Sequence, residues 1–174
     1  MPLPVAHTLL GAAIITATLP DPSPARNWKT LLIGGALSVS PDLDYFFETT
    51  QHRGFTHSLL FALIVGGLCF AVTRFANIRV AVALAAAFLS HALLDYATTK
   101  TMPGVELLWP ITNQRFGLGL IDYYDLTGID PVHFLYQNVA SDLFKAGLIE
   151  LLIFGPLFLC VLFVKYGFKR LSKS

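Results

Sequence analysis

The fourth apolar stretch of the chain carries a histidine and an aspartate four residues apart, His91 and Asp95. On an α-helix this spacing places both side chains on one face, where they can bind the same ion or substrate group. Imidazole and carboxylate are ligands that suit Zn, Mn or Fe. The pair also has an ordinary interpretation, in which it satisfies a backbone group or a neighbouring helix at a helix end.

Two aspartates, Asp42 and Asp44, follow Pro41 in the segment Ser40-Pro-Asp-Leu-Asp. On a regular helix their side chains would point about 200° from each other. Pro41 disturbs the preceding turn, which brings both carboxylates to one site or leaves Asp44 as a partner that orients a ligand. The alternative is a helix terminus that simply meets water.

The most distinctive segment is His52-Arg-Gly-Phe-Thr-His-Ser58, in which a loop separates two histidines. Gly54 permits a tight turn, and Thr56 is predicted to cap the next helix with His57 in its first turn. Arg53 offers a planar fork for phosphate or carboxylate. A solvated His52 and a lipid-headgroup contact by Arg53 are the alternatives.

Five apolar stretches must position these residues. A spanning helix needs about 20 mostly apolar residues, and the third and fifth stretches come closest to that length. The first has no basic segment before it and no cleavage site, so we expect a retained helix rather than a signal peptide. The five stretches are Val5–Leu19, Trp28–Phe47, His57–Phe75, Arg79–Thr98 and Lys145–Phe168.

The composition agrees with a membrane protein. Of the 174 residues, 55% are hydrophobic and 13% are charged, whereas soluble domains carry about 25% charged residues. The net charge of +1 excludes a strongly electrostatic nucleic-acid binder. Cys69 and Cys160 lie inside apolar runs and predict neither a disulfide nor a cysteine-type zinc site. We therefore predict one all-α domain over 1–174, a transmembrane bundle of about five helices.

The basic residues predict how this bundle is oriented. If all five stretches span, 8 of the 12 basic residues fall on one side, which marks the cytoplasm. The N-terminus and the long Thr99–Phe144 connection then face outward, and the C-terminus lies inside. The eight residues are Arg26, Lys29, Arg74, Arg79, Lys165, Lys169, Arg170 and Lys173.

This orientation brings the polar residues to the same outer face. His7 alone is typical of a helix-end histidine, and His133 has no matching partner and is left out of the site. Ionisable residues at membrane depth are costly and usually functional. Imidazoles and carboxylates without a compensating run of lysines need a cation. We predict a divalent metal, zinc first with Mn or Fe as alternatives, as one or two ions.

The Thr99–Phe144 connection is too long for a structureless loop, so we expect it to be ordered. Glu106–Thr112 and Arg115–Gly119 are predicted to form a short hairpin or flap. Asp130-Pro131 has the pattern of a helix start, from which a helix could run through Gln137–Phe144 into the last span.

Taken together, the motifs resemble those of the YdjM-like membrane-bound metal-dependent hydrolases, a bacterial family with inner-membrane members described as LexA-regulated. The likeness covers about His7 to Phe116. It implies metal ligation by His7, Asp42, His57, His91 and Asp95, with Asp44 and His52 close by. The site is also similar, more loosely, to that of helical zinc-dependent phospholipases C. The matching segments are His7 with Gly11, Pro41–Asp44, His52–Ser58, Ser90–Asp95 and Leu108-Trp-Pro110.

The resulting hypothesis is an inner-membrane hydrolase whose metal-activated water attacks an ester or phosphoester of a lipid-linked substrate at the outer face. Asp44 or His52 would act as general base or orient a ligand. Arg53 and Arg115 would stabilise developing negative charge, and Trp109 would line a lipid entrance or anchor the interface. The alternatives are a non-catalytic protein with a structural metal and a transporter that uses the acidic cluster as a pathway.

Overall fold

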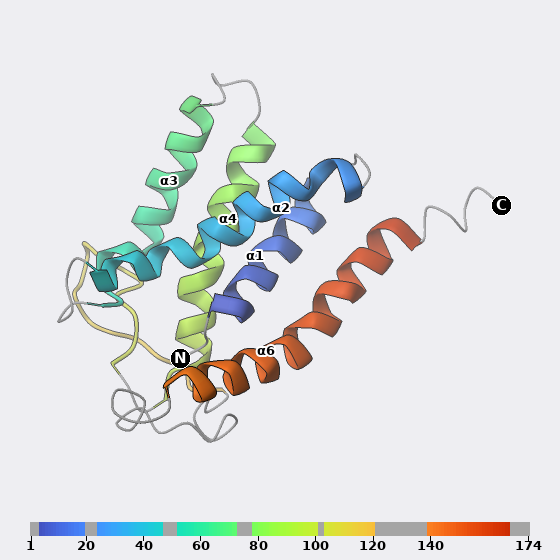
Figure 1. The fold of residues 1–174 in the computed structure, drawn as a ribbon. Coiled ribbons are helices and arrows are strands. Elements are labelled where there is room, and N and C mark those ends of the chain that lie inside the picture. Colours follow the sequence, from blue (N-terminus) through green and yellow to red (C-terminus); the bar gives the residue numbers. More distant parts are fainter. Residues whose placement is uncertain are drawn as a thin grey trace.

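The computed structural model describes residues 4–19, 24–46, 52–72, 78–100, 103–120 and 139–167. The regular elements in these ranges are helices, and residues 103–120 form an irregular segment with one isolated bridge, which confirms the predicted all-α bundle (Figure 1). The α-helices are α1 (Pro4–Thr18), α2 (Pro24–Val39), α3 (Leu59–Val72), α4 (Ile78–Thr98) and α6 (Val139–Leu162). Three short turns complete them: the 3-10 turns η1 (Ser40–Phe46) and η2 (Phe55–His57) and the π-turn η3 (Phe163–Gly167).

Several predicted helices begin or end differently from expectation, and α6 begins at Val139 rather than at Lys145. The second does not continue to Phe47, because α2 ends at Val39 and the chain continues through Pro41 as η1. The third begins at Leu59, where the Ser58 hydroxyl accepts the Phe61 N–H at 3.1 Å. Ser58 is therefore the cap, and the prediction that Thr56 would cap this helix was wrong.

The helix α1 lies at the centre of the packing and contacts α2, α4 and α6, while α3 packs on α4 (Figure 1). The core consists of Ile15 from α1 with Ala83, Leu84 and Ala87 from α4. Alanines on α4 leave little side chain between the helices, so the backbones can approach closely, as is common in membrane bundles.

The crossing of α1 and α2 depends on two glycines. A Cβ atom on Gly11 would lie 2.6 Å from both the Gly34 carbonyl oxygen and Ser38 Cβ, and one on Gly34 would lie 2.4 Å from Ile15 Cγ1. A side chain at Gly11 would therefore meet the backbone of α2, and one at Gly34 would have to displace the Ile15 side chain. This crossing also determines the position of His7 at the start of α1 and of η1 at the end of α2.

Within the part of the chain that the structure describes, two helices are long and apolar enough to cross a membrane by length and composition, α4 and the segment Ser141–Tyr166. Large apolar side chains face outward from the bundle, including Leu63 (70% exposed), Val72 (83%) and Leu152 (75%). Such an exposed apolar surface is expected where a protein faces lipid. It is not expected of a water-soluble helical bundle.

The middle of α6 and the following turn η3 contact the two ends of α1 in the same order. Glu150 accepts the Ala6 N–H at 3.0 Å near the start of α1, and Lys165 donates to the Thr16 and Leu19 carbonyls near its end. The first and last helices therefore run parallel. This is the relation that five alternating spans require of the first and the fifth.

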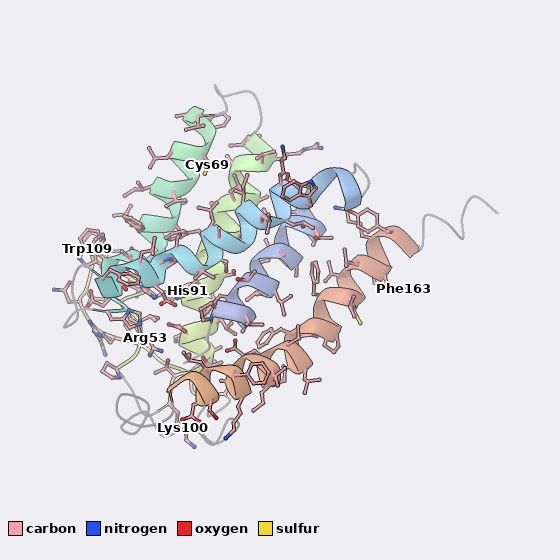
Figure 2. The ribbon with its side chains drawn as sticks, viewed as in Figure 1. Arg53, Cys69, His91, Lys100, Trp109 and Phe163 are labelled. Carbon is pink, nitrogen blue, oxygen red and sulfur yellow. The ribbon has the colours of Figure 1, made fainter. Side chains whose placement is uncertain are left out.

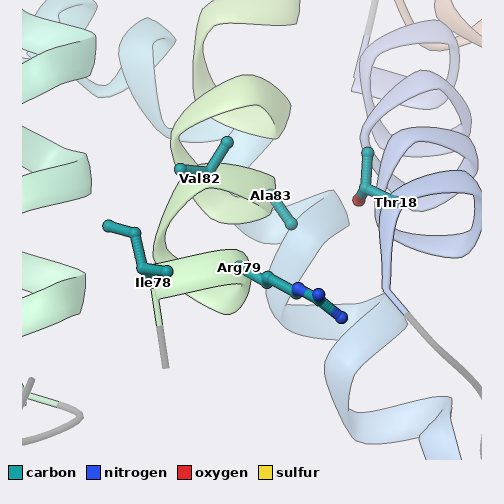
Figure 3. A pocket seen from close by; sticks show the side chains of 5 residues that line it. All are labelled: Thr18, Ile78, Arg79, Val82 and Ala83. Carbon is teal, nitrogen blue, oxygen red and sulfur yellow. The ribbon is translucent and has the colours of Figure 1, made fainter. Parts of the chain in front are cut away.

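The far end of the bundle, where α1 ends and α4 begins, holds a small, mostly apolar pocket. Thr18 and Arg79 contribute its polar groups, and Ile78, Val82 and Ala83 line the rest (Figure 3). None of the predicted site residues lies there. The predicted site is at the opposite end of these helices.

Replacing Gly11 by alanine should destabilise the protein, because the new methyl group collides with the α2 backbone. Overpacking of this kind costs about 1–3 kcal/mol, which should appear as a lower melting temperature of the detergent-purified protein. Gly67→Ala is the matched control, since nothing lies within 4 Å of its added Cβ. Equal melting of the two variants would contradict the close α1–α2 crossing.

Candidate metal centre

Four elements bring the predicted ligands together at one end of the bundle. The first turn of α1 carries His7, η1 carries Asp42, η2 carries His57, and the second half of α4 carries His91 and Asp95. The three histidines and Asp95 are fully buried, and Asp42 is 18% exposed. Figure 2 places His91 in the interior where α1, α2 and α4 meet.

Four of these residues form a compact ligand group. The atoms offered by Asp42, His57, His91 and Asp95 all lie within 4.8 Å of one another. Asp42 Oδ1 is 3.1 Å from His91 Nε2 and 3.7 Å from His57 Nε2, and Asp95 Oδ2 is 3.8 and 3.9 Å from the same two nitrogens. A tetrahedral ion with bonds of about 2.0–2.1 Å separates its ligands by about 3.3–3.4 Å. The group could therefore hold one metal ion after small adjustments.

Most of these atoms have no other partner. Among the described residues, Asp42 Oδ1, His57 Nε2 and His91 Nε2 are buried and make no hydrogen bond, and Asp95 Oδ2 has the Arg53 guanidinium beside it at 3.1 Å. Buried polar atoms are nearly always paired, because an unpaired one costs about 1–3 kcal/mol. A bound cation would satisfy the three unpaired atoms and the carboxylate that faces them.

Hydrogen bonds on the far side of the rings aim these nitrogens inward. His91 Nδ1 lies 2.7 Å from the Ser38 carbonyl oxygen, which can only accept a hydrogen bond. Thr56 donates to Asp44, so its oxygen is free to accept from His57 Nδ1 at 3.0 Å. Both Nδ1 atoms then carry the proton, and both Nε2 lone pairs face the centre, as in metal-binding histidines.

His7 lies beside this group of four. Its ring stacks on His91 with a centroid distance of 3.8 Å, and its Nε2 is 3.6 Å from Asp95 Oδ1. Asp95 therefore presents one oxygen to the group of four and the other to His7. In this arrangement His7 could be a fifth ligand of the same ion, or could bind a second ion that shares Asp95.

Asp44 organises the loop that carries the histidines. Its carboxylate accepts from His52 Nδ1 at 2.7 Å, from Thr56 Oγ1 at 2.8 Å and from the Arg53 amide at 3.2 Å. Burial alone would raise the pKa of Asp44, but the hydrogen bonds from His52 and Thr56 outweigh it and lower the pKa below its usual range. Asp44 is therefore ionised at neutral pH and holds His52 at the edge of the site.

Arg53 contacts Asp95 rather than the open edge of the site. Its Nε lies 3.1 Å from Asp95 Oδ2, and its Nη1 donates to Thr99 Oγ1 and the Pro103 carbonyl. The residue has a positive φ of 70° and is only 4% exposed. A non-glycine residue in this region carries strain that its surroundings must offset. This geometry suits a residue that positions Asp95 better than one that contacts substrate.

The long connection covers the site with the predicted hairpin, in which Val105 and Phe116 form an isolated antiparallel bridge. Arg115 donates to the His52 carbonyl at 3.1 Å and contacts Glu106 Oε1 at 3.3 Å. Trp109 lies against Phe55, with ring centroids 5.7 Å apart (Figure 2). The expected helix start at Asp130-Pro131 and His133 lie outside the described residues.

Some residues that complete the site were not found from the sequence. The Ser38 carbonyl, Thr99 and Pro103 orient His91 and Arg53 through backbone or hydroxyl contacts, and such contacts leave no pattern in residue type. Glu150 was visible as an acid in an apolar helix, but its contact with α1 depends on how the helices pack.

Comparison with known proteins identifies the family of this chain. A family model described as YdjM inner membrane protein matches residues 1–170. The chain belongs to the YdjM family. Like the other members of this family, it is an inner membrane protein, and the resemblance found in its motifs is confirmed.

Sequence comparison finds a relative, inner membrane protein YbcI of Escherichia coli (strain K12). The alignment of 100 residues is 38% identical and covers 51% of this chain and 57% of YbcI. This chain therefore matches somewhat more than half of the length of YbcI. No solved structure matches.

Replacing Arg53 by methionine should strongly destabilise chelator-treated protein, because a buried Asp95 then loses its cationic partner. Breaking a buried pair in this way costs about 3–5 kcal/mol. Arg115→Met is the control, since the Arg115–Glu106 pair is partly exposed and such pairs contribute about 0–1 kcal/mol. Equal losses of melting temperature in the two variants would contradict the role assigned to Arg53.

Proposed function

We propose that this protein is a metal-dependent hydrolase with a divalent ion, zinc in the first place, held by Asp42, His57, His91 and Asp95. His7 adds a fifth ligand or contributes to a second ion. The observation that carries this proposal is the convergence of four imidazole and carboxylate ligand atoms on one point, three of which make no hydrogen bond among the described residues. Two imidazoles and two carboxylates with no thiolate suit Zn, with Mn or Fe as alternatives.

A divalent ion at this position would supply a Lewis acid and a water nucleophile near neutral pH. His52 is the side chain that we assign as the proton acceptor at the edge of the site. Asp44 holds its Nδ1 at 2.7 Å, and its Nε2 lies 3.7 Å from Asp42 Oδ1. His52 is 18% exposed, whereas the other histidines of the site are fully buried. Water and substrate would therefore approach along the edge formed by His52 and Asp42.

The surroundings of this edge favour an ester or phosphoester carried by a lipid. Phe46 (79% exposed), Phe55 (43%), Leu108 (39%) and Ile111 (88%) present apolar surface from η1, η2 and the hairpin. Arg115 is 26% exposed and is the residue we assign to the negative charge of the substrate. We place Trp109, which packs on Phe55, at the entrance for the apolar chain.

The positive-inside rule places this site at the outer face of the membrane, with the N-terminus outside and the C-terminus in the cytoplasm. The parallel arrangement of α1 and α6 supports an odd number of alternating spans. Arg79 at the far end of the bundle is then cytoplasmic.

A structural ion is the second candidate, and one observation favours it. Four protein ligands complete a tetrahedral shell, whereas catalytic zinc sites leave one position to water or substrate. The partly exposed Asp42 favours catalysis, because a carboxylate at the edge can yield its position to water. A transporter has less support, since the apolar core around Ile15, Ala83 and Leu84 follows the site along the bundle.

Detergent-purified protein should contain stoichiometric metal by elemental analysis, and His91→Ala and Asp95→Ala should both lose it. His52→Ala is the matched variant: it should keep the metal and lose hydrolysis of a panel of phospho- and carboxyl-ester lipids by 100-fold or more, as expected when a general base is removed. Metal without any hydrolysis would favour the structural ion. Wild-type metal content in both alanine variants would refute the site.

Reporter fusions should show the orientation. Alkaline phosphatase inserted at the exposed Asn113 of the hairpin should be active, because it folds only outside the cytoplasm. Green fluorescent protein fused to the C-terminus should fluoresce, because it folds in the cytoplasm. The opposite pair of results would invert the proposed topology.

A further inference from the structure

The helix α6 carries one fully buried charged side chain, Glu150. Only 6% of the most apolar window of the segment Ser141–Tyr166 is buried in the protein. Placing a carboxylate in such a helix is costly unless it is paired, and ionisable residues at membrane depth are usually functional. The proposed reaction makes no direct use of Glu150, so its burial needs another explanation.

Glu150 contacts the backbone of α1. Its Oε2 accepts the Ala6 N–H at 3.0 Å. Because α1 begins at Pro4, the Ala6 amide is among the first N–H groups of the helix, which have no partner within it. Glu150 thus caps α1 from another helix, and its negative charge also suits the positive end of the helix dipole.

The residue next to Ala6 is His7, and this ring lacks the support that the other histidines have. His91 and His57 are each held by an oxygen at Nδ1. Neither ring nitrogen of His7 has a hydrogen-bond partner among the described residues. The position of His7 therefore depends on its stacking against His91 and on the backbone of the first turn of α1. Glu150 holds that turn.

We infer that Glu150 is a positioning residue of the metal centre: it accepts the Ala6 N–H and thereby fixes His7 against Asp95 and His91. The last helix, which carries none of the ligands, would in this way complete the site. This inference rests on the proposed metal centre. Loss of a partner that orients a metal-binding histidine typically lowers metal affinity 10- to 100-fold.

The test is the zinc affinity of full-length protein in detergent, measured by competition with a chelator. Glu150→Ala should bind zinc at least tenfold more weakly than wild type. Glu150→Gln should stay within about threefold, because its amide oxygen can still accept the Ala6 N–H. Lys165→Met is the matched control: it removes the other polar contact of α6 with α1, to Thr16 and Leu19, and should leave zinc affinity unchanged.

The outcomes distinguish a failure of the role assigned to Glu150 from a failure of the metal centre. Absence of zinc from wild-type protein would refute the metal centre. Wild-type zinc affinity in Glu150→Ala, or equal weakening in Lys165→Met, would overturn the inference while the centre stands. If Glu150→Ala does not fold, Glu150→Gln remains decisive, since a tenfold loss there would contradict an acceptor role. The cobalt-substituted spectrum is a second readout and should change in Glu150→Ala only.

Discussion

The structure depends on one electrostatic constraint: an apolar bundle has to accommodate several imidazoles and carboxylates that face each other away from water. His57 Nε2, His91 Nε2 and one oxygen of Asp42 have no hydrogen-bond partner among the described residues. Arg53 offsets part of the negative charge through Asp95. The remaining lone pairs are satisfied most simply by a cation, which would then hold η1, η2 and α4 together.

The packing of the helices serves this centre. Gly11 and Gly34 let α1 and α2 approach closely, and the Ser38 carbonyl of α2 lies 2.7 Å from His91 Nδ1 on α4. The turn η1 then places Asp42 opposite His91, and Asp44 fixes the loop that leads to His57. A change in the crossing of α1 and α2 would therefore move ligands from two elements at once. Stability and ligand geometry are coupled in this fold.

Much of this arrangement was predictable from residue spacing and charge. The pair His91 and Asp95 lies on one helical face, as its spacing predicts, and the basic residues correctly grouped His7, Asp42 and His57 at the same end of the bundle. The role of Arg53 was not predictable, because its contacts with Thr99 and Pro103 depend on how the long connection folds back. The cap at Ser58 was missed because Thr56, an equally good capping residue, binds Asp44 instead.

X-ray absorption at the zinc edge reports the ligands of the metal centre. A site of His57, His91, Asp42 and Asp95 should show only nitrogen and oxygen ligands at about 2.0–2.1 Å, with the outer-shell scattering of at least two imidazoles. His57→Ala should remove one imidazole from that pattern. A sulfur ligand at about 2.3 Å, which would have to come from Cys69 or Cys160, or the absence of bound metal in folded protein, would refute this site.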